Sequence, residues 1–268
     1  MLPLLFALVA VPPDTTLPFA NEATRSLIER AILRHATADQ SVRDYLARFR
    51  YRLSFGLGRR RWAEVPNAAA EEQEGTVQWS QPNDLRVDIL GRRAAARSNT
   101  MRLNSSFDQP WFFPRGLGDS IRVFGNDVPP RAAIHPLAAG APAWYRYRVS
   151  DSVQYATTNG RRVKLIAVEV LPRRSGAALV AGRLWFDAAE ADLVRISFRF
   201  VGTELWLDPE EEEKDGKRIN RIVSRILTLD ADLEYALQGE RYWMPYRQTV
   251  SGRVELPWLG ELVLPFEA

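Results

Sequence analysis

The spacing of apolar residues changes from helical to strand-like near residue 50. From Asn21 to Ala36 the apolar positions recur every three to four residues, which predicts an amphipathic helix with Asn21 or Thr24 as its N-cap. A second, short helix is predicted over residues 39–49, because four apolar residues there fall on one helical face. The positions that carry these two predictions are Ala23, Leu27, Ile28, Ile32 and Leu33, then Val42, Tyr45, Leu46 and Phe49.

Beyond residue 50 the period is two, which indicates strands. Residues 75–90 form two such runs around the turn signal of residues 81–84, and this pattern predicts a hairpin. Residues 217–229 fit either a helix or a strand, and a strand from about Ile222 is favoured. The other predicted strands are residues 50–57, 120–124, 144–154, 161–171, 177–187 and 192–202.

Two of the predicted strands indicate how the sheet is buried. In residues 193–201, Val194, Ile196, Phe198 and Phe200 alternate with polar residues, so one face is apolar and the other polar. Residues 163–171 are largely apolar on both faces. An antiparallel sheet with one dry face needs a cover, and the two N-terminal helices are the candidates. The predicted fold is therefore α+β and β-dominated, with a single domain over residues 21–268.

The composition excludes several classes of function but does not by itself indicate one. The 268 residues are 46% hydrophobic, enough for a packed core, and the net charge of +3 is too balanced to predict nucleic-acid binding. The chain has no cysteine, which excludes disulfides, thiolate metal sites, cysteine nucleophiles and a lipid-modified N-terminal cysteine.

The N-terminus resembles a secretory signal. The run from Met1 to Val11 is apolar and too short to span a bilayer, but it has the length of a signal-peptide core. No basic residue precedes it, and a small-residue cleavage site is suggested only near Ala10 or Ala20. We therefore treat residues 1–20 as a signal-like segment and expect the protein in the periplasm or at the periplasmic face of the outer membrane.

Catalytic and cofactor signals are weak. The two histidines, His35 and His135, lack the spacing of a metal site, and no glycine-rich phosphate loop is present, so no metal or other cofactor is expected. The tetrapeptide ending in Ser120-Ile121 resembles the Gly-Asp-Ser-Leu block of a family of lipases and esterases. The family's Asp-x-x-His base is missing, since no histidine follows His135. A serine esterase at Ser120 is thus a remote alternative to a non-enzymatic protein.

Charged residues favour surface roles. Asp230 and Asp232 would share one face of a strand, where such a pair usually forms surface ion pairs. Arginine doublets recur at predicted strand ends, and they could either meet anionic head groups or protect strand edges, the second being favoured. These are Arg92-Arg93, Arg161-Arg162 and Arg173-Arg174, with the triplet Arg59-Arg60-Arg61.

Several strand motifs recur in an order known from one superfamily. They run from the hairpin of residues 75–82 through Tyr145-Arg146-Tyr147 and residues 168–173 to Gly182-Arg-Leu-Trp-Phe-Asp187 and a late Tyr-Trp-x-Pro-x-Arg-Gln at residues 242–248. Over roughly residues 21–256 the chain resembles the half-barrel of the lipoprotein-sorting (Lol-type) carriers, most strongly a related family of bacterial outer-membrane-associated proteins.

The resemblance implies a strongly curved antiparallel sheet, or half-barrel, whose concave face is covered by the N-terminal helices. In the carriers that cavity receives acyl chains, so the implied function is non-enzymatic binding of a lipid, lipoprotein or other apolar ligand. The alternative is an interaction module with a filled core that docks on an outer-membrane protein partner. The candidate cavity residues are Trp79, Trp111, Phe112, Trp144, Trp185 and Phe186.

Overall fold

A computed structural model describes residues 17–58, 67–81, 84–96, 120–121, 133–158, 161–174, 179–201, 227–256 and 260–267. Within these residues the chain forms one α-helix, one 3-10 turn and twelve strands, so the fold is mostly β. In chain order they are α1 (Glu22–Ser41), β1 (Asp44–Gly58), β2 (Asn67–Ser80), β3 (Asp84–Ala96), β4 (Ser120–Ile121), β5 (Ala133–Ile134), η1 (Ala141–Ala143), β6 (Tyr145–Thr158), β7 (Arg161–Pro172), β8 (Leu179–Asp187), β9 (Leu193–Val201), β10 (Leu227–Gln238), β11 (Tyr242–Leu256) and β12 (Gly260–Glu267).

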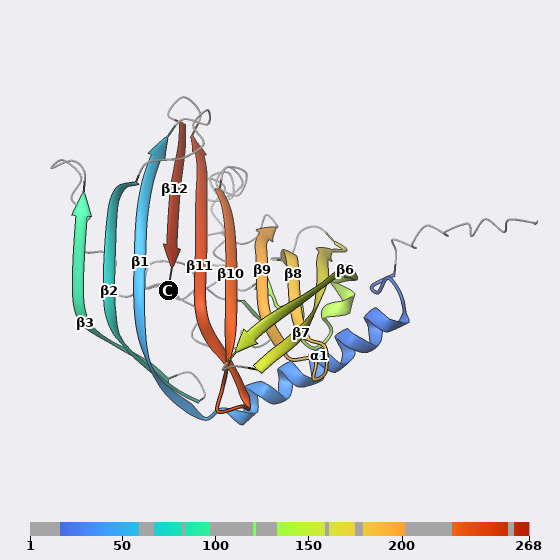
Figure 1. Cartoon of the computed structure of the whole chain (residues 1–268). Helices are drawn as coiled ribbons and strands as arrows, with labels where there is room; N and C mark the ends of the chain where they lie inside the picture. The colour runs from blue at the N-terminus through green and yellow to red at the C-terminus, as the bar shows by residue number, and fades with distance from the viewer. Residues whose placement is uncertain are drawn as a thin grey trace, which may run out of the picture.

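Ten of the strands form one antiparallel sheet in the order β3-β2-β1-β12-β11-β10-β9-β8-β7-β6. Chain neighbours pair along most of this order, and β12 inserts between β1 and β11. Figure 1 shows β1–β3 and β10–β12 standing nearly upright, whereas β6 and β7 run obliquely and α1 lies near them. The short strands β4 and β5 pair only with each other in the described chain.

The first predicted helix is confirmed and the second is wrong. The Asn21 side chain accepts a hydrogen bond from the Thr24 backbone N–H at 2.8 Å and so caps α1. The region predicted as a second helix instead starts β1, whose pairing with β2 begins at Asp44. The burial pattern explains the error: positions 45, 47 and 49 point inward in strand alternation, while Leu46 is 73% exposed. A helix would have had to bury Leu46.

The predicted strands are confirmed where the structure describes them, including the hairpin, whose first pair is Ser80 with Asp84. The strand predicted from Ile222 is described from Leu227 as β10. Strands β11 and β12 were not predicted from the pattern of apolar residues. In β11, Pro245 lies at a register shift opposite Tyr235, where the regular alternation is broken.

The main core lies on one face of the sheet, which we call the apolar face. From α1 it includes Leu27, Ile28 and Ala31, and from the sheet it reaches Tyr51 on β1 and Leu233 on β10. As predicted, β7 is buried on both sides, because a second, smaller cluster lies on the opposite face. That second cluster consists of Val163, Leu165, Ala167, Trp185 and Val194.

The predicted orientation of one side chain, that of Val194, is wrong. Ile196 and Phe198 lie in the main core and Phe200 packs against it, as predicted, but Val194 belongs to the second cluster. The cause is a bulge, since the pairing of β8 with β9 shifts register between Trp185 and Phe186. The extra residue turns Val194 to the other face.

Candidate functional site

We call strands β6 to β9 the β6–β9 region, and elements outside the sheet pack against it as a cover. Beyond the strand-to-strand ladders, the main contacts of the described chain join α1 and η1 to β6 and β5 to β8. Two buried tyrosines of β6 fix this cover through their hydroxyls. Tyr147 donates to the Pro136 carbonyl at 2.7 Å, and the Tyr145 hydroxyl accepts from the Val180 N–H at 3.1 Å. Burial raises the pKa of both hydroxyls, so they stay protonated donors.

Two histidines 100 residues apart meet at this cover. The ring of His35 on α1 stacks on that of His135 with centroids 4.5 Å apart and planes within 5° of parallel. His135 is fully buried, and its Nδ1 accepts the Leu137 backbone N–H at 2.9 Å. Its Nε2 has no hydrogen-bond partner in the described chain. Burial, together with the neighbouring His35, lowers the pKa of His135 well below its usual value, so this ring is neutral.

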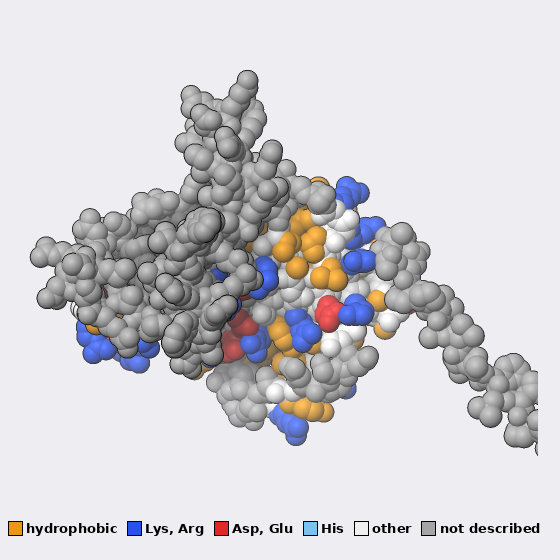
Figure 2. All heavy atoms as spheres, turned by 90° about the horizontal axis from the view of Figure 1, so that it is seen from above, with side chains coloured by type: hydrophobic (Ala, Val, Ile, Leu, Met, Phe, Trp, Pro, Cys, Tyr) orange, Lys and Arg blue, Asp and Glu red, His pale blue; other side chains and the backbone are white. Residues whose placement is uncertain are grey.

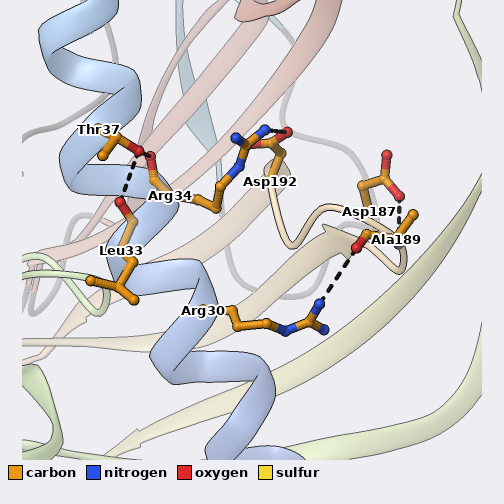
Figure 3. Close-up of polar contacts among 7 residues, drawn as sticks. All are labelled: Arg30, Leu33, Arg34, Thr37, Asp187, Ala189 and Asp192. Carbon is orange, nitrogen blue, oxygen red and sulfur yellow. Dashed lines mark hydrogen bonds and ion pairs between the residues drawn. The ribbon is translucent and has the colours of Figure 1, made fainter.

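The solvent side of α1 is tied to the turn between β8 and β9. Arg34 donates Nε and Nη2 to the two carboxylate oxygens of Asp192, at 3.0 and 2.7 Å, and Arg30 reaches the Ala189 carbonyl at 3.4 Å. Figure 3 shows both arginines extending from the helix toward this turn. The Asp192 hydrogen bond raises the pKa of Arg34 further. The helix is thus held by a bidentate ion pair as well as by its buried face.

The segment before α1 covers part of the β6 edge. The Tyr147 N–H donates to the Pro18 carbonyl at 2.8 Å, and the Ala20 N–H donates to the Tyr147 carbonyl at 3.1 Å. The Phe19 ring stacks on that of Tyr147 with centroids 5.7 Å apart. The end of the signal-like segment of residues 1–20 therefore packs on the domain, while residues 1–16 lie outside the described chain.

The other end of the sheet, which we call the β1–β3 region, continues the apolar face. Tyr45 of β1 stacks on Trp79 of β2 with centroids 5.8 Å apart, and the two residues are directly paired. Phe49 lies over Gly75, where any side chain would meet its ring at 2.8 Å. Among the described elements, the main contacts of these strands are with their neighbours in the sheet.

Buried polar groups interrupt the apolar face in the β1–β3 region. Glu71 is only 3% exposed, and it accepts from Arg92 on β3 and from the Gln73 amide, both at 2.6 Å. The register places Glu71 opposite Leu53 and Gln73 opposite Tyr51, two residues of the main core. The carboxylate is therefore paired, as a buried charge must be.

The opposite face of the sheet carries a ladder of ion pairs. Arg195 and Arg199 of β9 each bind an aspartate of β10 through two nitrogens, Asp232 and Asp230 respectively. The prediction that these two aspartates form surface ion pairs is confirmed. On β7, Glu169 accepts from both Arg148 and Arg183, and the Arg148 hydrogen bond is the main cause of its lowered pKa.

Trp185 lies within this ladder. The guanidinium carbons of Arg195 and Arg183 lie 5.0 and 5.8 Å from its ring centroid, and its indole nitrogen is buried without a hydrogen-bond partner in the described chain. Figure 2 shows basic, acidic and apolar side chains lying next to one another on the described surface.

The described arginine doublets are engaged within the chain. Arg92 binds Glu71 and Arg93 binds Glu72 at 2.8 Å. The Arg162 guanidinium lies 4.0 Å from the Tyr155 ring centroid, and that of Arg174 lies 5.4 Å from Trp144. The triplet of residues 59–61 lies outside the described chain.

The six predicted cavity residues do not share one face. Trp79 and Phe186 lie on the apolar face, and Trp144 packs against the main core, whereas Trp185 lies in the cluster on the opposite face. Phe186 is fully buried among core residues of the β6–β9 region. Trp111 and Phe112 lie outside the described residues.

The geometry around Ser120 gives the esterase alternative no catalytic pair. Ser120 of β4 is paired with Ile134, the residue before His135. The His135 nitrogen that could act as base, Nε2, accepts no hydrogen bond from any described residue. No group of three metal-ligating side chains occurs among the described residues, and none of their helices is long and apolar enough to cross a membrane.

Sequence reasoning missed the contact between His35 and His135. Nothing in the local pattern around either residue brings together two histidines 100 positions apart. The one available signal was at His135, which lies between Ile134 and Pro136 in an apolar stretch.

Comparison with known proteins gives only distant structural similarities. No protein-family model and no curated protein matches the sequence. One similar structure is a "putative outer membrane lipoprotein-sorting protein domain" from Vibrio parahaemolyticus, with 12% identity, 91% of this chain and 90% of that chain covered, and a TM-score of 0.31. Another is the MucA/MucB complex of Pseudomonas aeruginosa, with 13% identity, coverage of 90% and 93%, and a TM-score of 0.23. TM-scores this low carry no argument about this chain.

Proposed function

We propose that this chain is a non-enzymatic binding domain of the bacterial envelope, located in the periplasm or at the periplasmic face of the outer membrane. It would hold an apolar ligand, such as a lipid or the acyl chain of a lipoprotein, against the apolar face of its sheet. In this proposal the sheet is a half-barrel whose concave side is the apolar face. The helix α1 covers one part of that side and the ligand occupies another.

The observation that carries the proposal is the mismatch between the sheet and its helix. The helix α1 has 20 residues, so it is about 30 Å long, and it crosses the strands from the β6 edge toward the start of β1 (Figure 1). With its side chains it is only about 10 Å across, whereas the longest strands have 15 residues and run for about 50 Å, so it covers a narrow strip of the sheet. The contacts of α1 with the sheet centre on β6. The apolar face continues to Val77 and Trp79 at the far end, where both side chains are already largely buried within the chain, so a ligand would lie beside them and against the half-buried Tyr45 and Phe49.

The aromatic character of the β1–β3 region suits an acyl chain. Tyr45 and Phe49 are half-buried aromatic side chains on this face, and they lie beside the buried Trp79. Tyr and Trp also keep one polar atom each, which suits the boundary between an acyl chain and its head group. Burying methylene groups there would be favourable by about 0.8 kcal/mol each, so a long acyl chain with about ten buried methylenes would supply about 8 kcal/mol against the cost of association.

Native mass spectrometry of the protein purified from envelope extracts tests this proposal. A stoichiometric lipid adduct that is lost on denaturation is the expected result. Two variants of adjacent β1 residues sharpen the test. Tyr45→Asp places a charge on the apolar face and should reduce uptake of an offered phospholipid about tenfold, while Leu46→Asp, on the opposite face, should leave uptake unchanged. A clean apo mass with no phospholipid uptake would contradict ligand binding.

The second candidate is an interaction module that docks on an outer-membrane partner without holding a ligand. The filled core of the β6–β9 region favours it, since Ile28, Phe186 and Ile196 there are completely buried by protein side chains. A clean apo mass combined with specific cross-linking of the domain to one outer-membrane protein would support this second candidate over the first.

A further inference from the structure

The strand β3 forms one edge of the ten-stranded sheet, and in the described chain it pairs only with β2. Residues 85–89 make no hydrogen bond other than those of the ladder with β2 and the contact between Arg86 and Asp88. The opposite edge of the sheet is different, because residues 18–20 pair with β6 there. Over residues 85–89 this edge therefore presents backbone N–H and C=O groups to which no described residue is bonded.

The side chains along this edge alternate cleanly between the two faces. Leu85, Val87 and Ile89 pair with Trp79, Val77 and Gly75 and so lie on the apolar face. Arg86 and Asp88 lie on the opposite face, with side chains 71% and 50% exposed. Lysine and proline commonly protect such an edge from pairing with another strand, and β3 contains neither.

We propose that β3 is a dimerisation edge, at which it pairs antiparallel with β3 of a second copy of this chain. The two-fold axis passes through Val87, so that Val87 faces its own copy. Leu85 of each chain then lies opposite Ile89 of the other, and Arg86 lies opposite Asp88 twice. Residues directly opposite each other share a face, so the apolar faces of the two sheets join without a break.

Charge complementarity selects this register over its neighbours. Moving the axis to Arg86 places Arg86 opposite its own copy and Asp84 opposite Asp88. Moving it to Asp88 places Asp88 opposite its own copy and leaves Arg86 facing Leu90. Like charges placed directly opposite each other destabilise a strand pair, so of these three registers only the one centred on Val87 joins opposite charges and apolar pairs throughout.

The regular part of the edge limits the length of this pairing. A bulge at Leu90 ends the regular ladder, because Gly75 pairs with Ile89 and Glu74 with Gly91. The pairing thus spans residues 85–89 of both chains. An interface this small predicts a weak dimer that forms with increasing protein concentration. Ligand binding on the apolar face is not required for it.

Sedimentation velocity over a range of concentrations tests the proposal. The wild-type mass should rise from 30.5 kDa toward twice that value. Arg86→Asp and Asp88→Arg each place like charges opposite one another, and each should weaken dimerisation about tenfold or more. The double variant carrying both exchanges restores opposite charges and should recover wild-type association. Lys164→Glu, at an exposed residue of β7, is the control and should have no effect.

Cysteine cross-linking tests the register separately, and it does not depend on the charge variants folding. The chain has no natural cysteine, so Val87→Cys introduces a single thiol. Paired residues of antiparallel strands have Cα atoms about 4.5 to 5.5 Å apart, within reach of a disulfide. Val87→Cys should therefore form a covalent dimer on oxidation. Leu85→Cys alone should not, because residue 85 lies more than about 13 Å from its own copy, but mixed with Ile89→Cys it should.

The sedimentation and cross-linking results together support or overturn the β3 dimer. Association that the single charge variants weaken and the double variant restores, with a disulfide at residue 87, supports the β3 edge. A protein that is monomeric at all concentrations, or a dimer that the charge variants leave unchanged, overturns it. If a charge variant lacks wild-type circular dichroism, the cross-linking pattern decides alone: a disulfide through residue 85 by itself would contradict the register.

Discussion

The β6–β9 region and the β1–β3 region belong to one sheet but are stabilised differently. In the β6–β9 region α1, β5 and η1 pack against the sheet, and tyrosine hydroxyls, the buried His135 and the Arg34–Asp192 ion pair hold them there. In the β1–β3 region the described contacts are mainly strand ladders and cross-strand pairs. In the proposed function the first region maintains the fold and the second binds the ligand, beside Val77 and Trp79, which are already largely buried within the chain.

The largest effect should come from the core beneath α1. Ile28→Ala removes three carbons from a completely buried site, and we expect it to lower the free energy of unfolding by about 3 kcal/mol. Leu46→Ala, at a site 73% exposed in the β1–β3 region, should change it by less than about 0.5 kcal/mol. Urea denaturation measures both values. Similar effects of the two variants would mean that α1 does not anchor the core.

Acidification should act on the β6–β9 region next most strongly. The pKa of His135 is lowered in the folded state, so the unfolded chain binds a proton more readily. Stability from this group is fully present above the ordinary histidine pKa of about 6.5 and falls as the pH drops below it, by at most about 1.4 kcal/mol per pH unit. Urea midpoints from pH 7.5 to 5 measure the loss.

A variant isolates the histidine from the carboxylates that also titrate at low pH. His135→Gln should be less stable than wild type at pH 7.5, because it loses the packed imidazole, but its midpoint should depend less on pH between 6.5 and 5. An unchanged pH dependence would assign the loss of stability to other groups.

The ion pair on the solvent side of α1 should matter less than the core. Arg34 is about half exposed, so solvent screens its interaction with Asp192, and Arg34→Ala should cost about 1 kcal/mol or less. Hydrogen exchange should quicken in α1, while β1–β3 exchange stays unchanged. Faster exchange throughout the sheet would contradict this local role.

The smallest effect is expected on the polar face of the sheet. Asp230→Asn removes one exposed ion pair with Arg199 and should change the free energy of unfolding by less than about 0.5 kcal/mol. Thermal unfolding at low and at moderate salt measures it. A loss of several kcal/mol would show that the ladder of ion pairs is a structural element in its own right.

The sequence predicted those parts of the fold that depend on local periodicity. The α1 cap at Asn21, the hairpin turn after Ser80 and the strands from β6 to β9 followed from residue spacing and turn residues. The helix predicted over residues 39–49 failed because Tyr45 and Phe49 satisfy both periods, and only the pairing with β2 decides between them. Val194 was assigned to the wrong face because a bulge cannot be read from alternation alone.

The candidate site was less predictable, because it depends on contacts between distant residues. Trp185 and Phe186 were grouped as cavity residues, although neighbours in a strand must point to opposite faces. The stacking of His35 on His135 and the pairing of residues 18–20 with β6 bring together residues about 100 to 130 positions apart. These contacts exist only because tertiary packing brings the distant residues together.

Hydrogen–deuterium exchange with and without an offered phospholipid tests the central claim most directly. We predict slow exchange of α1 and of the strands beneath it in both conditions, and a gain of protection on phospholipid binding that is confined to the β1–β3 region and is lost in Tyr45→Asp. Protection that appears instead in α1 and β6–β9, or no change anywhere, would contradict the division of the sheet into a region that maintains the fold and a region that binds.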